Sequence, residues 1–342
     1  MRLLIITQAV DRDNPVLGFF HRWIEEFAKH CEFITVICLE RGRYNLPANV
    51  KVLSLGKENG ESKLKYLKNF YKYIWQERKN YDRVFVHMNQ EYVLLGSLFW
   101  KLWGKKVAMW RNHATGNFFT RLAVYLSDKV FCTSPQSYTA QFSKTEIMPV
   151  GINTDFFTPD SSVIKKTSSI LFLGRIAPVK KVEIFIDALN ELQKLNVQFF
   201  ATIAGEALPR DTEYERKIKN KVSEYELTDR VKFIGSVTQE QARQLYREHE
   251  LYVNLTAAGS MDKTIFEAMA CGSIPLVVNP FFHNQLPESF VLPGDFTSIE
   301  LADYLEKIFK KTEDKSEDLS SVILQLVNKH DLGSLIKLLL TA

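Results

Sequence analysis

Two basic residues lie between an apolar run and a helical pattern in the second half of the chain. The run Ile170–Leu173 is followed by "GRIAPVKK", which brings Gly174, Arg175 and Lys180 to the start of the next predicted helix. A glycine allows a ligand to approach the backbone closely, and two cations near a helix N-terminus attract phosphate oxygens. The pattern therefore predicts a diphosphate site. The alternative is that the lysines are solvated surface charges.

The stretch "GSMDKTIFEAMACG", which begins at Gly259, holds a second group of candidates. Its loop supplies consecutive backbone donors, with Asp262 and Lys263 at the helix start, for a phosphate oxygen or for sugar hydroxyls. Glu267 is the only charged residue in the apolar segment that follows. Because buried carboxylates need a partner and an acidic residue binds the ribose in dinucleotide folds, we expect Glu267 to bind a ribose. The alternative is a solvent-facing glutamate that stabilises the helix N-terminus electrostatically.

The first half of the chain places further polar residues after predicted strands. Gly18 lies between the first strand and a helix, where it either approaches phosphates or a transferred group, or is a glycine that the turn requires. Candidates for contact with an acceptor or a transferred group follow the fourth and fifth strands: His87, Asn89, Arg111, Asn112 and His113. A lone histidine is more often structural, but two at adjacent strand ends favour a shared site.

Several common cofactor and metal motifs are absent from the sequence. No GxGxxG follows a predicted strand and no GxxxxGK[ST] occurs, which argues against nicotinamide and P-loop nucleotide sites. The pair Asp11 and Asp13 resembles a metal-binding DxD, but we interpret it as part of a solvated loop. The four cysteines have no metal-ligand spacing, which fits packing roles in a reducing compartment. We therefore predict no metal and no cofactor.

The elements that position these residues alternate between strands and helices. In the first half we expect strands at Arg2–Thr7, Phe33–Cys38, Val50–Leu55, Arg83–Met88, Lys106–Trp110 and Lys129–Thr133. Apolar residues at one-face spacing predict helices between most of these strands, as in "FFHRWIEEFAKH" and "KLKYLKNFYKYIWQERK". This alternation is typical of an α/β protein with a mostly parallel sheet.

The same pattern restarts after a Pro- and Ser-rich joint at Thr158–Ser169. Strands are expected at Ile170–Leu173, Gln198–Ala204, Val231–Ile234, Leu251–Leu255 and Ile274–Val278, with helices such as Val182–Leu195 and Gln239–Glu248. We predict two doubly wound domains, at residues 1–157 and 158–314, and C-terminal helices in 315–342 that return to the first domain. Ligands bind outside the carboxyl ends of parallel strands, so a cleft between two such sheets is the expected site.

Composition limits the class and the location of the protein. The 342 residues are 46% hydrophobic and 25% charged, as in a packed globular protein of two domains. The longest apolar run stops at Lys101, short of a membrane span, and the N-terminus lacks the features of a signal peptide, so we expect a cytoplasmic protein. The charge is uneven, with 22 Lys and Arg against 13 Asp and Glu through Val150 and a net charge of +4 overall. No nucleic-acid-binding motif accompanies this basic half.

These motifs together resemble the GT-B glycosyltransferases, specifically glycosyltransferase family 4. The resemblance is strongest in Ile170–Val278, through "LFLGRIAPVKKVEIFIDAL", "IAGE", "VKFIGSV" and "FEAMACGSIPLVV" in that order. It extends to "VGINTDFFTP", "CTSPQSY" and "NKHDLGSLIKLL". The resemblance implies two Rossmann-like domains that face a central cleft, and retaining, metal-independent transfer of a sugar from a nucleotide-sugar donor, without a separate cofactor.

The resemblance also implies roles for individual residues. Arg175 and Lys180 would hold the diphosphate and stabilise the leaving group, and His113 would lie near the donor sugar. Glu267 would bind the ribose and Gly18 would close on the phosphates. The donor-binding set implied in this way comprises Gly18, Gly174, Gly205, Ser260, Met261, Asp262, Lys263, Thr264 and Glu267.

One position departs from the family pattern. The family usually has a second acid eight positions before the ribose-binding one, and Gly259 lies there in this chain. That acid contacts the donor sugar, so either Asp262 and the loop backbone substitute for it, or the sugar is held differently, or activity is reduced. We expect substitution by Asp262.

The acceptor is expected to be a glycan or a lipid-linked molecule in the assembly of a surface polysaccharide or glycoconjugate. Lysines interleaved with aromatic residues from Lys63 to Lys79 could contact an anionic membrane, or could form the solvated face of a packed helix. Two other functions remain open: a nucleotide-sugar epimerase or phosphorylase of similar architecture, and a catalytically impaired partner protein. The nucleotide, the sugar and the oligomeric state are not predicted.

Overall fold

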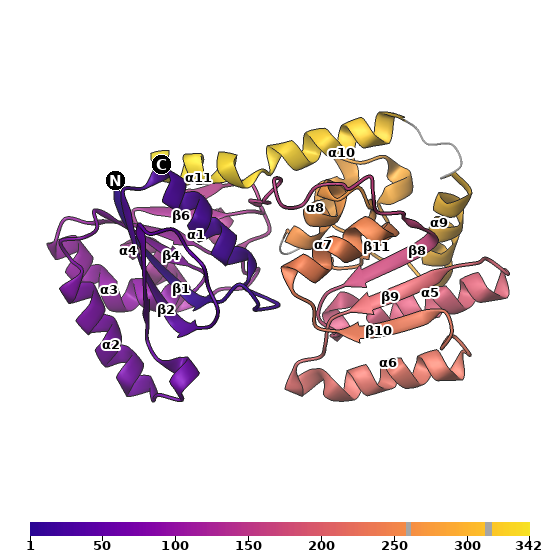
Figure 1. The fold of residues 1–342 in the computed structure, drawn as a ribbon, viewed down its shortest axis with the longest axis horizontal. Helices are drawn as coiled ribbons and strands as arrows, with labels where there is room; N and C mark the ends of the chain where they lie inside the picture. The colour runs from indigo at the N-terminus through magenta and orange to yellow at the C-terminus, as the bar shows by residue number, and fades with distance from the viewer. Residues whose placement is uncertain (258–260, 312–316) are drawn as a thin grey trace. The chain divides into compact units, whose positions relative to one another are not determined.

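The computed structural model describes residues 1–257, 261–311 and 317–342, which form two compact units (Figure 1). Unit 1 contains residues 1–151, 261 and 331–342, and unit 2 contains the described residues of 152–330 apart from 261. The sequence pattern predicts boundaries after residues 157 and 314. The structural division instead falls at Gly151 and His330, so α10 (Glu317–Lys329) belongs to unit 2 and only α11 (Leu332–Thr341) belongs to unit 1.

Unit 1 is built on a parallel sheet in the strand order β3-β2-β1-β4-β5-β6-β7. Its strands are β1 (Arg2–Val10), β2 (Phe33–Arg41), β3 (Val50–Ser54), β4 (Arg83–His87), β5 (Lys106–Trp110), β6 (Lys129–Cys132) and β7 (Thr145–Ile147). The sequence predicted the first six, and β7 is an addition. Three residues are too few to show a strand period, which explains why β7 was missed.

Helices cover both faces of this sheet, because successive strand residues point to opposite sides. Leu3 and Ile5 pack with α1 (Phe19–His30) and α11, whereas Leu4 and Ile6 pack with the helices on the other face. Those helices are α2 (Lys63–Gln76), α3 (Gln90–Leu102) and α4 (Phe118–Leu126). Burial on both faces is the reason that these strands read as continuous apolar runs.

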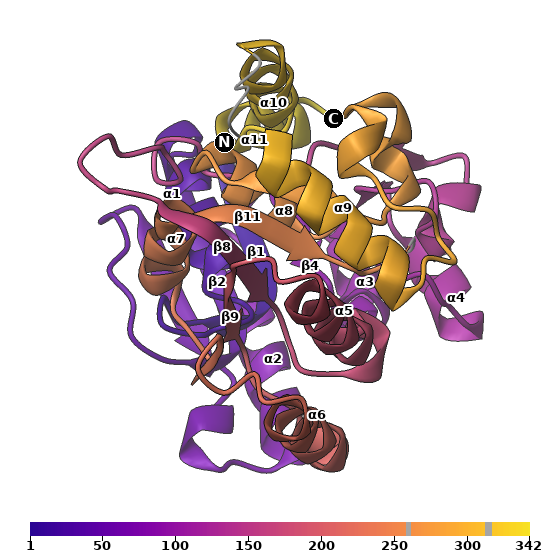
Figure 2. The same cartoon turned by 90° about the vertical axis from the view of Figure 1, so that its right-hand side faces the viewer.

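Unit 2 contains a parallel sheet in the order β10-β9-β8-β11-β12. Its strands are β8 (Lys166–Leu173), β9 (Phe200–Ala204), β10 (Val231–Gly235), β11 (His249–Asn254) and β12 (Ile274–Val277). Its helices are α5 (Val182–Lys194), α6 (Thr212–Glu224), α7 (Gln239–Glu248), α8 (Lys263–Ala270), α9 (Ser298–Lys311) and α10. Helices α5 and α9 lie side by side against the sheet, and α7 lies on its other face (Figure 2). The predicted joint at 158–169 overlaps β8, which begins at Lys166.

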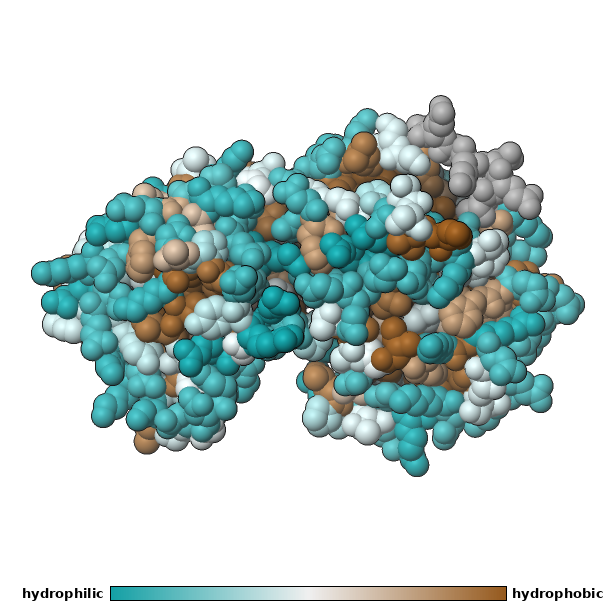
Figure 3. Space-filling view, viewed as in Figure 1, coloured by the Kyte–Doolittle hydropathy of each residue, from teal (hydrophilic) through white to brown (hydrophobic). Residues whose placement is uncertain are grey.

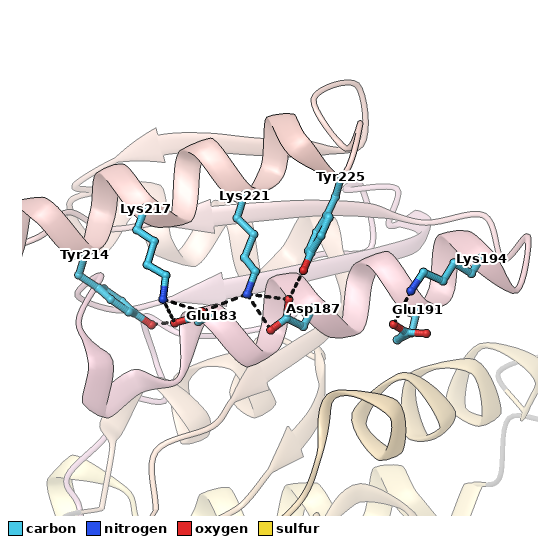
Figure 4. Close-up of polar contacts among 8 residues, drawn as sticks. All are labelled: Glu183, Asp187, Glu191, Lys194, Tyr214, Lys217, Lys221 and Tyr225. Atoms are coloured by element: carbon cyan, nitrogen blue, oxygen red, sulfur yellow. Dashed lines mark hydrogen bonds and ion pairs between the residues drawn. The ribbon is translucent and has the colours of Figure 1, made fainter.

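An ionic network joins α5 to α6 in unit 2 (Figure 4). Lys221 Nζ lies 3.0 Å from Glu183 Oε1 and 2.8 Å from Asp187 Oδ1, and Lys217 Nζ lies 2.9 Å from the same Glu183 oxygen. Hydrogen bonds from Lys217 and Lys221 hold the pKa of the Glu183 carboxyl below its usual value. The network fixes the two helices that follow β8 and β9.

Candidate functional site

The carboxyl ends of β8 and β11 are neighbours in unit 2, and most of the predicted donor-binding residues lie after them. Strand β11 pairs in parallel with β8, with Val253 opposite Phe172. Gly174 and Arg175, which follow β8, therefore lie at the same edge of the sheet as Thr256, which follows β11. Lys180 ends the short 3-10 helix Pro178–Lys180 just before α5, and Asp262 is the residue before α8.

Lys180 and Asp262 form an ion pair at this edge. Lys180 Nζ lies 2.6 Å from Asp262 Oδ2 and donates a hydrogen bond to Thr256 Oγ1 at 2.9 Å. The same Asp262 oxygen accepts hydrogen bonds from Asn254 Nδ2 and Thr256 Oγ1, each at 3.0 Å. Burial by itself would raise the pKa of Asp262, but the Lys180 charge and these hydrogen bonds outweigh burial and lower it. Lys180 is therefore not a solvated surface lysine.

Three polar residues in β11 and just after it, which were not predicted from the sequence, hold this arrangement together. Tyr252, Asn254 and Thr256 occupy alternate positions and so share one face of the strand. The Tyr252 hydroxyl lies 2.7 Å from Thr264 Oγ1 and donates to the Leu173 carbonyl at 3.3 Å. Polar residues at period two in "LYVNLT" were the available signal. The network connects the end of β8, the end of β11 and the first turn of α8.

Arg175 and the two glycines near it complete the β8 edge. Arg175 is exposed and makes no hydrogen bond or ion pair with any residue that the structure describes. Gly205, directly after β9, has φ 132°, and a Cβ there would lie 2.0 Å from the Gly174 carbonyl oxygen. Only glycine fits this approach of two backbones. Gly205 therefore packs the β9 turn against Gly174, while the space beside Gly174 on the Lys180 side stays open.

Glu267 lies on the buried side of α8. It is 7% exposed, and its Oε2 accepts a hydrogen bond of 3.4 Å from the Tyr246 hydroxyl. Burial, reinforced by the Glu267 charge, raises the pKa of Tyr246, which therefore stays protonated as a donor. Lys263 lies one turn earlier on α8; burial lowers its pKa and the Glu267 charge opposes that shift. The alternative of a solvent-facing Glu267 is therefore wrong.

The remaining residues of the opening loop are described only in part. Gly259 and Ser260 lie outside the described residues. Met261 is 6% exposed and belongs to unit 1, and Thr264 is held by Tyr252. Within residues 1–257, 261–311 and 317–342, no group of three or more His, Cys, Asp and Glu side chains has the arrangement of a metal site.

Two of the unit 1 candidates have packed environments. Gly18 is buried, and a Cβ there would lie 2.6 Å from the Asn14 carbonyl oxygen, so the turn itself requires a glycine. His87 is 1% exposed, stacks on Phe20 at 3.8 Å between ring centroids, and lies 3.1 Å from Thr7 Oγ1 through its Nδ1. These contacts favour a structural role for His87. Asn89, the residue before α3, is half-buried.

The residues after β5 form a second polar edge in unit 1. Arg111 is 8% exposed and donates through Nη2 to the Thr115 carbonyl at 2.9 Å, while Asn112 Oδ1 accepts from the Thr133 backbone at 2.9 Å. His113 lies at the surface. Desolvation and the Arg111 charge lower the pKa of His113, so the ring is neutral at pH 7. A neutral imidazole can both donate and accept hydrogen bonds.

Comparisons with known proteins agree with this architecture. Residues 154–321 match the family model described as Glycosyl transferases group 1. The chain is 24% identical over 144 residues to D-inositol 3-phosphate glycosyltransferase of Mycobacteroides abscessus, which covers 40% of this chain and 32% of the relative. It is 25% identical over 213 residues to the lipopolysaccharide core biosynthesis mannosyltransferase LpsB of Rhizobium meliloti, which covers 60% and 58%. The chain thus spans less than two thirds of either relative.

A solved structure resembles the whole chain. Anabaena Alr3699/HepE in complex with UDP superposes with a TM-score of 0.78 at 19% identity, over 100% of this chain and 99% of that one. At this identity the likeness concerns the fold. The chain has the GT-B fold, and its residues 154–321 match the Glycosyl transferases group 1 model.

Proposed function

We propose that the protein is a retaining, metal-independent glycosyltransferase of family 4 that transfers a sugar from a nucleotide-diphosphate donor. The observation that carries the proposal is the placement of Lys180 and Arg175 at the carboxyl edge of the unit 2 sheet, inside the matched domain. Both cations lie just before or near the N-terminus of α5, where backbone N–H groups also favour an anion. HepE, a protein of the same fold, binds UDP.

Lys180 and Arg175 would supply the main catalytic effect. Departure of a nucleoside diphosphate develops negative charge on its phosphate oxygens, and preorganised cations stabilise such charge without moving during the reaction. Lys180 is preorganised by Asp262 and Thr256, whereas Arg175 has no such restraint among the described residues and is free to reach a ligand. The two cations would offset part of this charge without a metal ion.

Glu267 would bind the ribose of the donor. Its carboxylate is held by Tyr246 and lies one turn after Lys263 at the start of α8. A carboxylate can accept hydrogen bonds from both hydroxyls of a vicinal diol. The loop before α8 would contact the sugar or the phosphates.

The missing family acid at Gly259 gives Asp262 two tasks in this proposal. Its Oδ2 is occupied by Lys180, Asn254 and Thr256. Its Oδ1 accepts no hydrogen bond from the described residues, so that oxygen can take a hydroxyl of the donor sugar. Asp262 then serves as the counter-ion of Lys180 and as a substitute for the missing acid.

The transfer assay that tests the proposal uses the full chain with a panel of nucleotide sugars and glycan or lipid-linked acceptors. We expect Lys180→Ala and Arg175→Ala each to lower kcat by about 100-fold or more, the loss typical of one oxyanion-stabilising donor. Lys181→Ala is the matched control, because Lys181 lies in the same loop but contacts the Gly294 carbonyl and the Phe296 ring. Wild-type rates in both site variants would exclude the proposed diphosphate site. Donor turnover to a new nucleotide sugar without any acceptor would indicate the epimerase instead.

We also propose that the acceptor belongs to surface glycan assembly, as for the relative LpsB, and that unit 1 contacts an anionic membrane through α2. Lysines 63, 65, 68 and 72 are exposed on this helix, whereas Phe70 and Ile74 are buried. Leu64 and Trp75 are 79% and 53% exposed. In the view of Figure 3 the surface of α2 is mostly hydrophilic, with few hydrophobic residues among the hydrophilic ones. Such a face suits electrostatic contact with lipid headgroups.

Co-sedimentation with vesicles that contain anionic lipid tests the membrane contact. We expect charge reversal of Lys65, Lys68 and Lys72 to Glu to abolish sedimentation. Reversal of three unit 2 lysines, Lys194, Lys232 and Lys310, is the control and should leave it intact. Equal sedimentation of both triple variants would contradict a role for α2. Among the described residues, no helix has the length and apolarity to cross a bilayer.

A further inference from the structure

The carboxyl edge of the unit 1 sheet collects buried polar atoms that lack partners. Gln90 Oε1, Arg111 Nη1 and Thr133 Oγ1 are enclosed and make no hydrogen bond with any described residue. Backbone bonds from Met88 N to the Trp110 carbonyl and from Arg111 N to the Phe131 carbonyl continue the ladders past β4, β5 and β6. The three residues therefore lie after adjacent strands of the sheet.

Arg111 is the most unusual member of this group. Its only side-chain hydrogen bond within the described chain goes from Nη2 to Thr115, and no described carboxylate lies within ion-pair distance of its guanidinium. Burial lowers the pKa of Arg111, and the more distant Glu91 charge opposes this. A buried charge without a counter-ion is strongly unfavourable, so such a group usually has a partner.

Arg247 shows how this protein satisfies a comparably buried guanidinium. The Arg247 side chain is 12% exposed, and Nη1 lies 3.3 Å from Asp160 Oδ2. Its Nε and Nη2 donate to the Thr158 carbonyl at 2.7 Å and to Thr158 Oγ1 at 2.9 Å. Arg247 needs no further ligand. Arg111 differs because Nη1 of its guanidinium makes no hydrogen bond with a described residue.

The first turn of α3 adds positive potential beside this edge. Asn89 precedes the 13-residue helix without a side-chain hydrogen bond to its free backbone N–H groups. Uncapped donors and the helix dipole favour an anion near this end. Glu91 in the same turn is exposed, and its charge does not pair with Arg111.

We propose that Arg111 binds an anionic group of the acceptor, a phosphate or a carboxylate, and that Gln90 Oε1 binds a neighbouring hydroxyl. This inference rests on the proposed function, because it assigns the acceptor to unit 1. A guanidinium recognises planar or tetrahedral oxyanions through two parallel N–H groups, and Nη1 supplies the unused one. The acceptor class is therefore a phosphorylated or acidic polyol.

Ligand protection of the full chain tests this site. The background carries Arg175→Ala and Lys180→Ala, so that anions cannot bind at the proposed donor site. The probes are glucose 6-phosphate, glucuronate and glucose at constant ionic strength, with thermal unfolding as the readout. We expect glucose 6-phosphate or glucuronate to raise the melting temperature and glucose to have at least a tenfold weaker effect. Protection by the phosphate alone or by the carboxylate alone identifies the source of the anion.

The variants separate binding from structure. Arg111→Gln should weaken anion protection at least tenfold, whereas Arg121→Gln, which removes an exposed arginine that contacts Tyr138, should retain it. Without ligand, Arg111→Gln should melt no lower than its parent, because an unpaired buried charge is removed; a purely structural arginine would give a lower melting temperature. If Arg111→Gln does not fold, Arg111→Lys keeps the charge but loses the fork, and at least threefold weaker protection is expected.

Two results would overturn the inference: no anion protects the parent protein, or Arg111→Gln and Arg111→Lys are protected as well as the parent. The wild-type chain is tested with UDP and GDP in the same series. Protection by a nucleoside diphosphate without protection by either acidic sugar would refute the Arg111 site and leave the donor site standing. Protection by an acidic sugar without protection by any nucleotide would refute the proposed donor instead.

Discussion

Removal of the Asp262 charge should destabilise unit 2 and leave unit 1 unchanged. Asp262→Asn keeps the shape of the side chain but replaces the counter-ion of Lys180 by a neutral amide. The Lys180 and Asp262 side chains are 17% and 16% exposed, so solvent screens the pair only in part. Breaking a buried ion pair costs about 3–5 kcal/mol, and with this partial exposure we expect a loss of about 2–3 kcal/mol at pH 7.

The stability that the Asp262 charge contributes depends on pH. The pKa of Asp262 is lower in the folded protein than its usual value. Its contribution to stability is therefore fully present above the unfolded pKa and is lost as the pH falls through the folded pKa. The difference in unfolding free energy between wild type and Asp262→Asn should be largest at neutral pH and should shrink below about pH 4, the usual range of an aspartate.

The chain provides its own control for this measurement. All five tryptophans, Trp23, Trp75, Trp100, Trp103 and Trp110, lie in unit 1. In urea, the unfolding transition of unit 2 by hydrogen exchange should shift to lower denaturant, while the tryptophan fluorescence transition should not. Equal stability of wild type and Asp262→Asn at pH 7, or an equal loss at pH 7 and pH 3, would refute the ion-pair argument. The same variant should lower kcat by about 10- to 100-fold, because Lys180 loses its restraint.

Further predictions concern two features that stabilise unit 2. Gly205→Ala should lower the unfolding free energy of unit 2 by about 2 kcal/mol or more in a urea titration, because φ 132° and the 2.0 Å approach to the Gly174 oxygen exclude a Cβ. Gly294→Ala is the control and should change this free energy little, because the space around Gly294 is open. Unchanged stability of Gly205→Ala would contradict the packing argument. Lys221→Met should lower the same free energy by about 1–2 kcal/mol, because the Lys221 side chain is only 17% exposed and pairs with Glu183 and Asp187. Unchanged stability would show that the α5–α6 network is dispensable.

The architecture was predictable because its signal is local. Continuous apolar runs between amphipathic helical patterns indicated two parallel sheets, and both are present. The division of the C-terminal helices was not predictable in this way, because α10 and α11 have similar apolar faces and their partners are set by tertiary packing. The first segment of unit 1 ends at Gly151. The predicted boundary lay later, after residue 157, because the polar joint at 158–169 was interpreted as the linker.

The site was predictable at its motif residues but not in its pairings. The prediction that Lys180 and Asp262 lie near helix starts follows from the sequence, whereas their ion pair depends on β8 and β11 being neighbours, which only the strand order establishes. Tyr252, Asn254 and Thr256 were passed over because the strand reads as apolar. His87 and Gly18 look equally suited to binding and to packing in the sequence, and burial is what favours packing.

Isothermal titration of nucleoside diphosphates into the wild-type chain and into Lys180→Ala tests the central claim most directly, with Lys181→Ala as the control. We expect at least one nucleoside diphosphate to bind the wild type and Lys181→Ala with the same affinity and to bind Lys180→Ala at least tenfold more weakly. Equal affinity for wild type and Lys180→Ala, or no binding of any nucleoside diphosphate to the wild type, would contradict it.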